Sequence, residues 1–510
     1  MKRILMTLLI VVCTIFITCA QNTPSLWTHK SNTGGNDFMI SDLNQNIYVF
    51  DNGSQGQTAP NVIKLSSGGG VVYSTSYLPA GYSSMDLNSC NYYLGNLYIG
   101  STVSGPSGNS RLCLTKTDAA TGAMLSQIVV DSVYANTWMN LQNREYYAFQ
   151  LSIDAGNYLH VSFIKTDSAF NNYICFLKFD LNFNLVSSFS YPLNPVDTWG
   201  QVEFANDGSA YFTYTEHIVK LKSDYSGLAW VDSLTNDPYA FPKCLSVNSS
   251  GEIVAVFQDY GNGTGTRVVK LLDNGSSFSQ IYDVPTYGNN SLELNKMVFS
   301  AGDNAIYLAG TINSTTTYNW FVYKLNATTG AIEWSDSAFN SLGVSKLLVS
   351  PTGNVIVAGG GENYYLWFYN STGNVDRVFV YDGACQANDM ISDALLVGTG
   401  AIVVTGYACE NSNTIAYGTT IKYNYPTITT GFPAVESLSG TLFPNPSGDR
   451  VFIIGTLQIR NVQAVDQFGK LINLPFEGNL INVGSLSNGI YVLTILSDEG
   501  AMSEKLLIEK

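Results

Sequence analysis

The sequence predicts an all-β protein, with an eight-bladed β-propeller followed by a small C-terminal immunoglobulin-like β-sandwich. Only 12% of the 510 residues are charged, against about 25% in a typical soluble domain. Tyr, Phe and Gly are abundant, and aromatic and β-branched runs separated by Gly and Asn are typical of strands and turns. A hydrophobic content of 45% excludes wholesale disorder. The net charge of −15 argues against a nucleic-acid partner.

The N-terminus has the pattern of a signal peptide over residues 1–20. Lys2 and Arg3 precede an apolar run over 4–17, and small residues follow, so cleavage is expected between Ala20 and Gln21. The run is shorter than the about 20 residues that cross a bilayer, and no transmembrane segment is expected in the mature chain. Two alternatives are a lipoprotein acylated at Cys19 and a retained membrane anchor.

A short phrase recurs eight times over residues 21–428. It joins a turn residue, often in a Gly-Asn pair, to a β-branched or aromatic run, and successive copies are spaced by about 50 residues. That period is typical of propeller blades rather than of helical solenoids. The copies begin at Asn46, Gly95, Gly156, Gly208, Gly251, Asn304, Gly353 and Gly400.

A second phrase, an apolar run ending in lysine, follows each first one, and a Gly-led strand with a late aromatic follows that. In the seventh copy we assign Asn370 to the lysine position. Each unit therefore predicts four strands, and stacking of neighbours around a ring buries their faces. The lysines are Lys64, Lys116, Lys178, Lys220, Lys270, Lys324 and Lys422.

The two ends of the repeat array predict how the ring closes. A spare strand at 26–29 precedes the first unit, and the eighth unit stops after its lysine strand near Tyr425. The spare strand is expected to complete the last blade. A seven-bladed ring is the alternative, because the stretch 73–92 is irregular.

The segment from Tyr323 to Trp334 resembles the tryptophan-docking repeat of quinoprotein propellers, and 115–122 has a similar turn. This resemblance implies only the fold and a tryptophan that packs on the adjacent blade. Quinoprotein dehydrogenases carry a vicinal disulfide and a Ca²⁺ site, whereas this chain has no adjacent cysteines. No cofactor and no metal are therefore expected.

A linker is predicted at 429–440, and a different pattern fills 441–510. Four phrases stand out there: Pro444-Asn445-Pro446, Asp466 with Gly469-Lys470, Gly489 with Tyr491, and a last strand containing Lys505. In order and spacing they resemble the C-terminal sorting domain of the type IX secretion system of Bacteroidetes. The resemblance implies recognition by the outer-membrane translocon, then removal of the domain with release or attachment to surface lipopolysaccharide. An ordinary immunoglobulin-like module is the alternative.

No pattern in the sequence identifies catalytic residues. His29, His160 and His217 lack metal-ligand spacing and are expected to be packed or solvated. Acids at inner strand ends could pair as in a glycan hydrolase or lyase, which is the alternative to a binding module. These acids are Asp42, Asp86, Glu203 and Asp393.

The remaining predictions concern cysteines and one loop. Cys385 and Cys409 are expected on one face of the ring, where a disulfide suits an exported protein. Cys90, Cys113, Cys175 and Cys244 have the pattern of packing cysteines, and their pairing is left open. An irregular loop over 134–147 is a candidate face for a glycan or protein ligand. Its candidate residues are Trp138, Asn140, Arg144 and Glu145.

Overall fold

The computed structural model describes most of the chain, and its described elements are strands. Contacts between residues divide it into two compact units, residues 1–427 and 428–510. Among the described residues, no helix has the length and apolarity needed to span a membrane. The described residues are all those outside 1–24, 32–34, 36, 53–59, 106–109, 135–148, 167–170, 194–198, 234–239, 249, 260–264, 288–291, 301–303, 314–317, 340–342, 351–352, 362, 384–388, 399, 410–415, 425–440, 455–458, 467–470 and 498–500.

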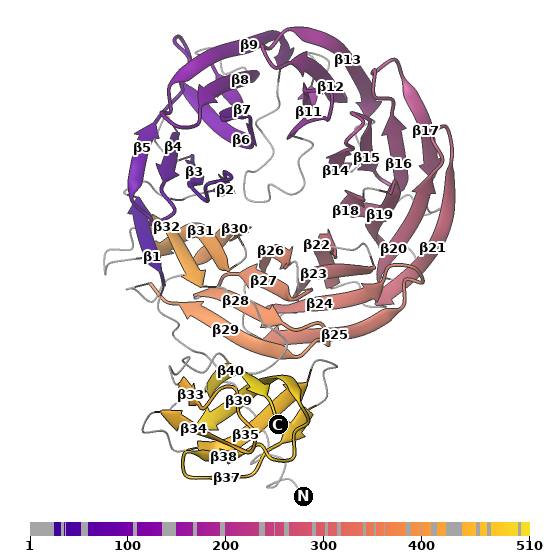
Figure 1. Cartoon of the computed structure of the whole chain (residues 1–510). Coiled ribbons are helices and arrows are strands. Elements are labelled where there is room, and N and C mark those ends of the chain that lie inside the picture. The colour runs from indigo at the N-terminus through magenta and orange to yellow at the C-terminus, as the bar shows by residue number, and fades with distance from the viewer. Residues whose placement is uncertain are drawn as a thin grey trace, which may run out of the picture. The chain divides into compact units, whose positions relative to one another are not determined.

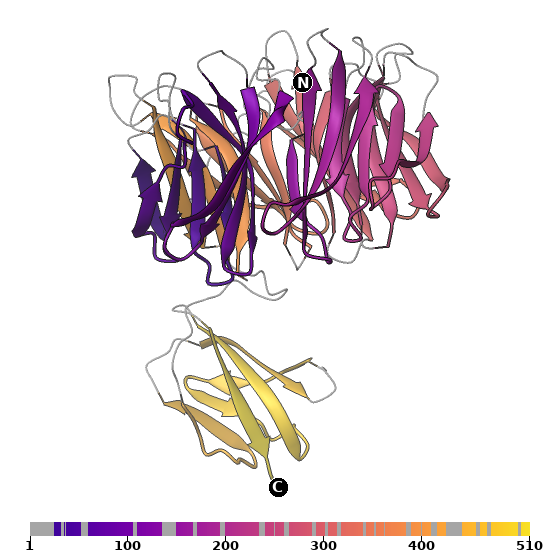
Figure 2. The ribbon, with the colours of Figure 1, turned by 90° about the horizontal axis from the view of Figure 1, so that it is seen from above.

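The described part of the first unit contains eight sheets of four antiparallel strands, arranged in a ring (Figure 1). Figure 2 shows the same strands from the side. The first four sheets, each from its inner to its outer strand, are β2 (Phe38–Ser41), β3 (Ile47–Asp51), β4 (Asn61–Leu65) and β5 (Val71–Thr75); β6 (Ser84–Tyr93), β7 (Asn96–Ser104), β8 (Ser110–Asp118) and β9 (Met124–Tyr134); β10 (Gln150–Ile153), β11 (Tyr158–Thr166), β12 (Asn172–Asp180) and β13 (Leu185–Leu193); and β14 (Trp199–Phe204), β15 (Ala210–Tyr214), β16 (His217–Leu221) and β17 (Leu228–Ser233).

The next three sheets repeat the same order, and the eighth takes its outer strand from the start of the chain. They are β18 (Ala240–Val247), β19 (Glu252–Asp259), β20 (Gly265–Asp273) and β21 (Phe278–Tyr287); β22 (Leu292–Phe299), β23 (Ala305–Asn313), β24 (Tyr318–Asn326) and β25 (Ile332–Phe339); β26 (Val344–Val349), β27 (Val355–Gly359), β28 (Tyr364–Tyr369) and β29 (Val375–Tyr381); and β30 (Met390–Val397), β31 (Ala401–Cys409), β32 (Ala416–Asn424) and β1 (Trp27–Ser31).

The ring closes because β1 pairs with β32, as the spare first strand predicts. The inner strands also contact one another in sequence order, and β30 contacts β2. Trp27 of β1 donates a hydrogen bond from Nε1 to the carbonyl oxygen of Ser67 in the first sheet, at 3.0 Å. Both pairing and side-chain contacts therefore join the two ends of the repeat array.

Apolar side chains fill the spaces between neighbouring sheets. Every residue of β3, β15 and β27 is buried, because these second strands have a neighbouring sheet on both faces. Phe176 of the third sheet and Phe212 of the fourth have ring centroids 5.3 Å apart. The low charge of the chain therefore reflects sheets that are covered on both sides.

Lysines on the third strands of six sheets fasten each of these sheets to the next. Lys64 of β4 donates to the carbonyl oxygen of Ala119, in the turn after β8, at 2.8 Å. The same kind of bond joins four further pairs of sheets, from Lys116 to Leu181 at 3.2 Å, Lys178 to Ser223 at 3.2 Å, Lys270 to Ala327 at 2.6 Å and Lys422 to Ser67 at 3.1 Å. Lys220 contacts the Asp273 carboxylate of the fifth sheet, whereas Lys324 pairs with Glu333 of its own sheet.

The assignment of Asn370 to the lysine position is wrong. Lys64 lies opposite Tyr48 in the register of the first sheet, and the corresponding pair in the seventh sheet is Phe368 opposite Ile356. Phe368 is buried in the apolar core between the seventh and eighth sheets. Asn370 lies two residues further on and accepts from the backbone N–H of Thr372 at 3.0 Å. Asn370 is therefore the turn residue that follows the strand.

The tryptophan docking expected from the quinoprotein-like repeat is present. Trp334 donates to the carbonyl oxygen of Ser371 in the next sheet at 3.2 Å. Its indole lies on Gly373, where an added Cβ would be 2.6 Å from the ring, and the φ of +85° also favours glycine.

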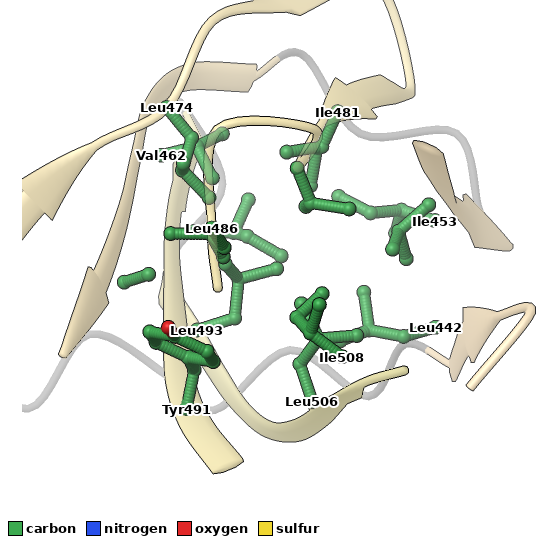
Figure 3. Close-up of a cluster of buried hydrophobic side chains, with 14 residues drawn as sticks. Leu442, Ile453, Val462, Leu474, Ile481, Leu486, Tyr491, Leu493, Leu506 and Ile508 are labelled. Carbon is green, nitrogen blue, oxygen red and sulfur yellow. The ribbon is translucent and has the colours of Figure 1, made fainter. Parts of the chain in front are cut away.

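The second unit contains two four-stranded sheets in its described residues. Apolar side chains from both sheets enclose one core, which includes Ile453, Val462, Leu493 and Leu506 (Figure 3). The first sheet orders β33 (Thr441–Phe443), β34 (Arg450–Ile454), β38 (Leu480–Asn482) and β37 (Phe476–Glu477); the second orders β36 (Leu471–Asn473), β35 (Ile459–Asp466), β39 (Gly489–Ser497) and β40 (Ala501–Ile508).

Candidate functional site

Three charged side chains occupy one equivalent position on the inner strands of the sixth, seventh and eighth sheets. Each follows a β-bulge that shifts the register by one residue. Lys296 lies opposite Ala309, Lys346 opposite Ala358, and Asp393 opposite Thr405. Bulges redirect side chains and are common beside functional sites. We call Lys296, Lys346 and Asp393 the axial cluster.

Asp393 links the axial cluster to the first sheet. Its Oδ1 lies 2.9 Å from Nζ of Lys346, and its Oδ2 accepts from the backbone N–H of Met39 at 3.1 Å. The Asp393 side chain is 11% exposed, whereas that of Lys346 is 42% exposed. The Lys346 side chain is therefore partly open to solvent, while its carboxylate partner is held by the scaffold.

The two lysines of the cluster have opposite pKa shifts. The charge of Asp393 raises the pKa of Lys346, against the effect of its burial. Burial lowers the pKa of Lys296 to about 7; Lys346 lowers it as well, and Asp393 partly offsets this. The positive charge on Lys296 is thus only weakly favoured near neutral pH.

The fourth sheet shows the structural role of this position. Gln201 lies in the bulge of β14, and its Oε1 accepts from the backbone N–H of Leu245 on the next inner strand at 3.0 Å. Asp393 makes the corresponding bond to Met39. A lysine ammonium has no acceptor atom, so Lys296 and Lys346 cannot perform this bridging role. Lys346 instead contacts the carboxylate of Asp393 on the next inner strand.

Of the other predicted acids, Asp42 belongs to a turn. Burial would raise the pKa of Asp42, but hydrogen bonds from Asn46, Tyr48 and Asn44 outweigh it and lower that pKa. Asp86 lies on β6 opposite Thr102. Within the described ranges, no group of three His, Cys, Asp or Glu side chains could hold a metal ion.

Glu203 lies on the inner strand β14, opposite Tyr211. Burial raises the pKa of its carboxyl group to about 7. A carboxylic acid with such a pKa can act as a proton donor near neutral pH. Glu203 is the predicted acid whose ionisation best suits catalysis.

Each of the three histidines lies on a strand of the ring. His160 is fully buried, and its Nε2 lies 2.9 Å from Oδ2 of Asp154. It is opposite Lys178 in the register, as Tyr48 is opposite Lys64, so it replaces the tyrosine of that repeat position. His29 is on the closing strand β1, and burial lowers its pKa. His217 begins β16, with Nδ1 3.3 Å from the carbonyl oxygen of Asp232.

The predicted loop and disulfide fall partly or wholly outside the described residues. Trp138, Asn140, Arg144 and Glu145 all lie outside them. Cys409, the last residue of β31, is disulfide-bonded, but Cys385 also lies outside the described ranges, so the pairing stays a prediction. The other described cysteines are free thiols: Cys90, Cys113, Cys175 and Cys244.

In the second unit, Asn445 joins the start of the domain to its last strand, β40. Its Nδ2 donates to the carbonyl oxygen of Lys505 at 2.6 Å, and its Oδ1 accepts from the backbone N–H of Leu507 at 2.9 Å. The flanking Pro444 and Pro446 cannot donate backbone bonds of their own.

The other motif residues that the structure describes lie on the second sheet of this unit. Tyr491 is buried, and its hydroxyl donates to the carbonyl oxygen of Ser487 at 3.0 Å. Gly489 begins β39, and Asp466, the last residue of β35, pairs with Tyr491 in the register. Gly469 and Lys470 lie outside the described residues. The described motif residues therefore hold β39, β40 and the start of the domain together.

Residues 441–509 match the family described as the secretion system C-terminal sorting domain. The second unit is a type IX secretion sorting domain. This confirms the resemblance noted in the sequence, and it places the protein at the cell surface or in the extracellular space. The sorting domain engages the type IX secretion system.

The ring resembles solved β-propeller structures. Sqt1 of Saccharomyces cerevisiae superposes with a TM-score of 0.52 at 12% identity, covering 80% of this chain and 100% of Sqt1. Sqt1 of Chaetomium thermophilum gives a TM-score of 0.51 at 10% identity, with 80% and 100% covered. At these identities the likeness shows the fold alone. No curated protein matches the chain.

Proposed function

We propose that this protein is an eight-bladed β-propeller, exported by a Bacteroidetes bacterium as a binding module without intrinsic catalysis. The eight four-stranded sheets and the pairing of β1 with β32 support eight blades over seven. The two sheets around one core support an immunoglobulin-like sandwich for the sorting domain. The sorting domain supplies the route to the cell surface.

The proposed order along the chain is a signal peptide at 1–20, the propeller at 21–428, a linker at 429–440 and the sorting domain at 441–510. The division between compact units at residue 427 supports the propeller boundary. The linker lies outside the described residues. Peptide mapping of the secreted protein tests both ends, with an N-terminus at Gln21 expected.

The axial cluster is the observation that carries a binding function. It combines the partly exposed side chain of Lys346 with a carboxylate, Asp393, whose second oxygen is fixed by the backbone of Met39. Binding sites commonly place a few polar groups on a rigid scaffold. The expected ligand is a glycan or a protein segment.

Screening the secreted protein on a glycan array, with hydrolysis measured in parallel, tests this function. Binding without turnover is expected, and it should weaken in Lys346→Met. Lys222→Met is the matched control, because Lys222 is exposed in a turn. Absence of binding to glycans and to proteins of the same cell surface would overturn the proposal.

A glycan hydrolase or lyase is the second candidate, and the raised pKa of Glu203 is the observation that favours it. Both retaining and inverting glycosidases need a second carboxylate, and Asp393 is already paired with Lys346. Turnover of any arrayed glycan that is lost in Glu203→Gln would favour the enzyme over the binding module.

We also propose that Cys385 pairs with Cys409. Asp389 accepts from the backbone N–H groups of Gly383 and Cys409, at 2.6 and 2.9 Å. A Cβ added at Gly383 would be 2.3 Å from the carbonyl oxygen of Cys409, so the chain two residues before Cys385 lies against Cys409. Non-reducing peptide mapping should recover the pair, and either cysteine linked elsewhere would contradict it.

A second ligand face is proposed on the loop 134–147, from its sequence alone. Trp138, Asn140, Arg144 and Glu145 combine an aromatic surface with polar groups, which suits a saccharide. If this loop contributes, Trp138→Ala should reduce binding on the same array. Unchanged binding would leave the axial cluster as the site.

A further inference from the structure

The first sheet of the sorting domain presents phenylalanines to solvent. Phe443 of β33 is 64% exposed, Phe452 of β34 is 50% exposed, and Phe476 of β37 is exposed as well. The chain has 25 phenylalanines, and among the side chains that the structure describes these three are the exposed ones. Clustered apolar side chains in water mark a surface that another molecule covers, so this sheet is a candidate interface.

Two of these phenylalanines are direct neighbours on the outer face of the sheet. Phe443 lies opposite Phe452 in the register of β33 and β34, and Phe452 lies opposite Leu480 of β38. Residues directly opposite one another share one face of a sheet. Leu442 and Ile453, which alternate with the phenylalanines along the same strands, face the core (Figure 3). The outer face therefore carries a row of large apolar side chains across three strands.

This apolar row departs from the alternation expected of a solvated sheet face. In a β-sandwich, inward apolar residues alternate with outward polar ones. Arg450, two positions before Phe452 on β34, is exposed on the same outer face, and it lies opposite the exposed Asn482. Aromatic side chains beside an arginine, with polar groups around them, are typical of the centre of a protein interface. The face therefore has the chemistry of a protein-binding surface.

The described motif residues of the domain act mainly within it. Asn445 uses its side-chain amide to bind β40, and Tyr491 is buried with its hydroxyl on the carbonyl oxygen of Ser487. The sorting domain nevertheless engages the secretion system, which requires an exposed contact. Phe443 directly precedes the Pro444-Asn445 motif, so the apolar row is continuous with a segment that the sorting family shares.

We propose that the outer face of the first sheet, centred on Phe443, Phe452 and Leu480, is the surface by which the secretion machinery recognises the sorting domain. The partner is a protein with an apolar groove that takes the two phenyl rings and with a carboxylate that meets Arg450. Central aromatic contacts carry much of the binding energy of such interfaces. The inference goes beyond the proposed binding function of the propeller and does not rest on it, because no residue of the ring takes part.

Surface delivery of the full chain in its own cells tests the inference. Phe443→Ser and Phe452→Ser should each slow delivery by about tenfold, the loss of affinity typical of a truncated central aromatic contact. The undelivered protein should accumulate in the periplasm, as measured by cell fractionation. Val492→Ser is the matched control, because Val492 is 49% exposed on the other sheet of the domain, and it should be delivered as the wild type is.

Two further measurements separate recognition from folding. Because Phe452 is exposed, the thermal unfolding transition of Phe452→Ser should match that of the wild type. A photoreactive phenylalanine analogue in place of Phe452 should crosslink in living cells to an outer-membrane protein of the secretion machinery. The same analogue in place of Val492 should give no such crosslink.

The outcomes decide between this surface and its alternatives. Normal delivery of the double variant Phe443→Ser/Phe452→Ser, or an equal loss in Val492→Ser, would overturn the inference. Crosslinking of position 452 to a second copy of this chain would assign the face to self-association and would overturn it as well. If Phe452→Ser does not fold, the crosslink decides in its place. Absence of any ligand for the ring, with delivery impaired in the phenylalanine variants, would overturn the proposed function alone.

Discussion

Lys422 donates a hydrogen bond from Nζ to the carbonyl oxygen of Ser67 at 3.1 Å, across 355 residues of sequence. The bond joins the third strand of the eighth sheet to the turn that follows the third strand of the first sheet. The same lysine position joins the first sheet to the second through Lys64 and Ala119. Ring closure therefore uses the contact that joins other neighbouring sheets.

Lys422→Met should destabilise the ring at its closure. The substitution keeps most of the apolar stem but removes the donor to Ser67, and a hydrogen bond to a charged group contributes about 1.5–3 kcal/mol. Burial lowers the pKa of Lys422, which offsets part of that gain, so the free energy of unfolding should fall by about 1–2 kcal/mol. Denaturant unfolding measures it, with Lys222→Met as an exposed control. Equal loss in both variants would contradict a closure role.

His160→Tyr should be tolerated better than His160→Ala. The tyrosine at the same repeat position, Tyr48, donates to Oδ2 of Asp42 at 3.0 Å, and the introduced phenol can reach Asp154 in the same way. Alanine would leave a cavity and would remove the imidazole that contacts the buried Asp154 carboxylate.

The same substitution should change the response to acid. Burial is the main cause that lowers the pKa of His160 below its usual 6.5, although Asp154 partly offsets it. As pH falls below 6.5 the unfolded chain binds the proton first, so the wild type loses stability. His160→Tyr should lack this loss. Melting temperatures at pH 7 and 5 measure it, and identical acid sensitivity in both proteins would refute the explanation.

Glu203→Gln should stabilise the protein increasingly as pH rises. Burial raises the pKa of Glu203 from 4.5 to about 7. Below pH 4.5 the carboxyl group is protonated in both states, and between these values the unfolded chain releases its proton first, so stability falls with rising pH. Above about pH 7 the Glu203 carboxyl group is ionised in both states, and its destabilising effect no longer increases. The difference in melting temperature between variant and wild type should therefore grow from pH 5 to 8. A constant difference would indicate an exposed carboxylate.

Asn445→Ala should impair sorting. It removes two bonds to β40, each worth about 0.5–1.5 kcal/mol, and so loosens the last strand. Surface delivery should fall and periplasmic protein should accumulate, as measured by cell fractionation. Asn473→Ala is the control, because Asn473 makes one exposed side-chain bond, to Gln463. Deletion of residues 437–510 should abolish delivery, and normal delivery of the deletion would contradict the sorting role.

The repeat pattern predicted much of the ring because its signals are local. Turn residues such as Gly353 and lysines such as Lys270 recur at fixed places in each unit, and the strands they mark are present. The lysine position of the seventh unit was assigned wrongly because spacing alone cannot detect a two-residue offset. Only the pairing of Phe368 with Ile356 in the sheet identifies Phe368 as the residue at the lysine position.

The axial cluster was only partly visible in the sequence. Asp393 was a candidate because it is an acid on an inner strand, but Lys346 and Lys296 were not singled out. Lys296, Lys346 and Asp393 come from three successive repeats, about 50 residues apart, and no sequence motif connects them. A bulge on each inner strand brings the three to one equivalent position.

The sequence alone determined the all-β class, the repeating four-strand unit and the sorting domain, because periodicity and short motifs depend on near neighbours along the chain. The tertiary structure decided which distant residues meet: Lys422 with Ser67, Lys346 with Asp393, and Asn445 with β40. Those contacts depend on register, bulges and ring closure, which place residues from different repeats side by side. A single linear pattern carries no such information.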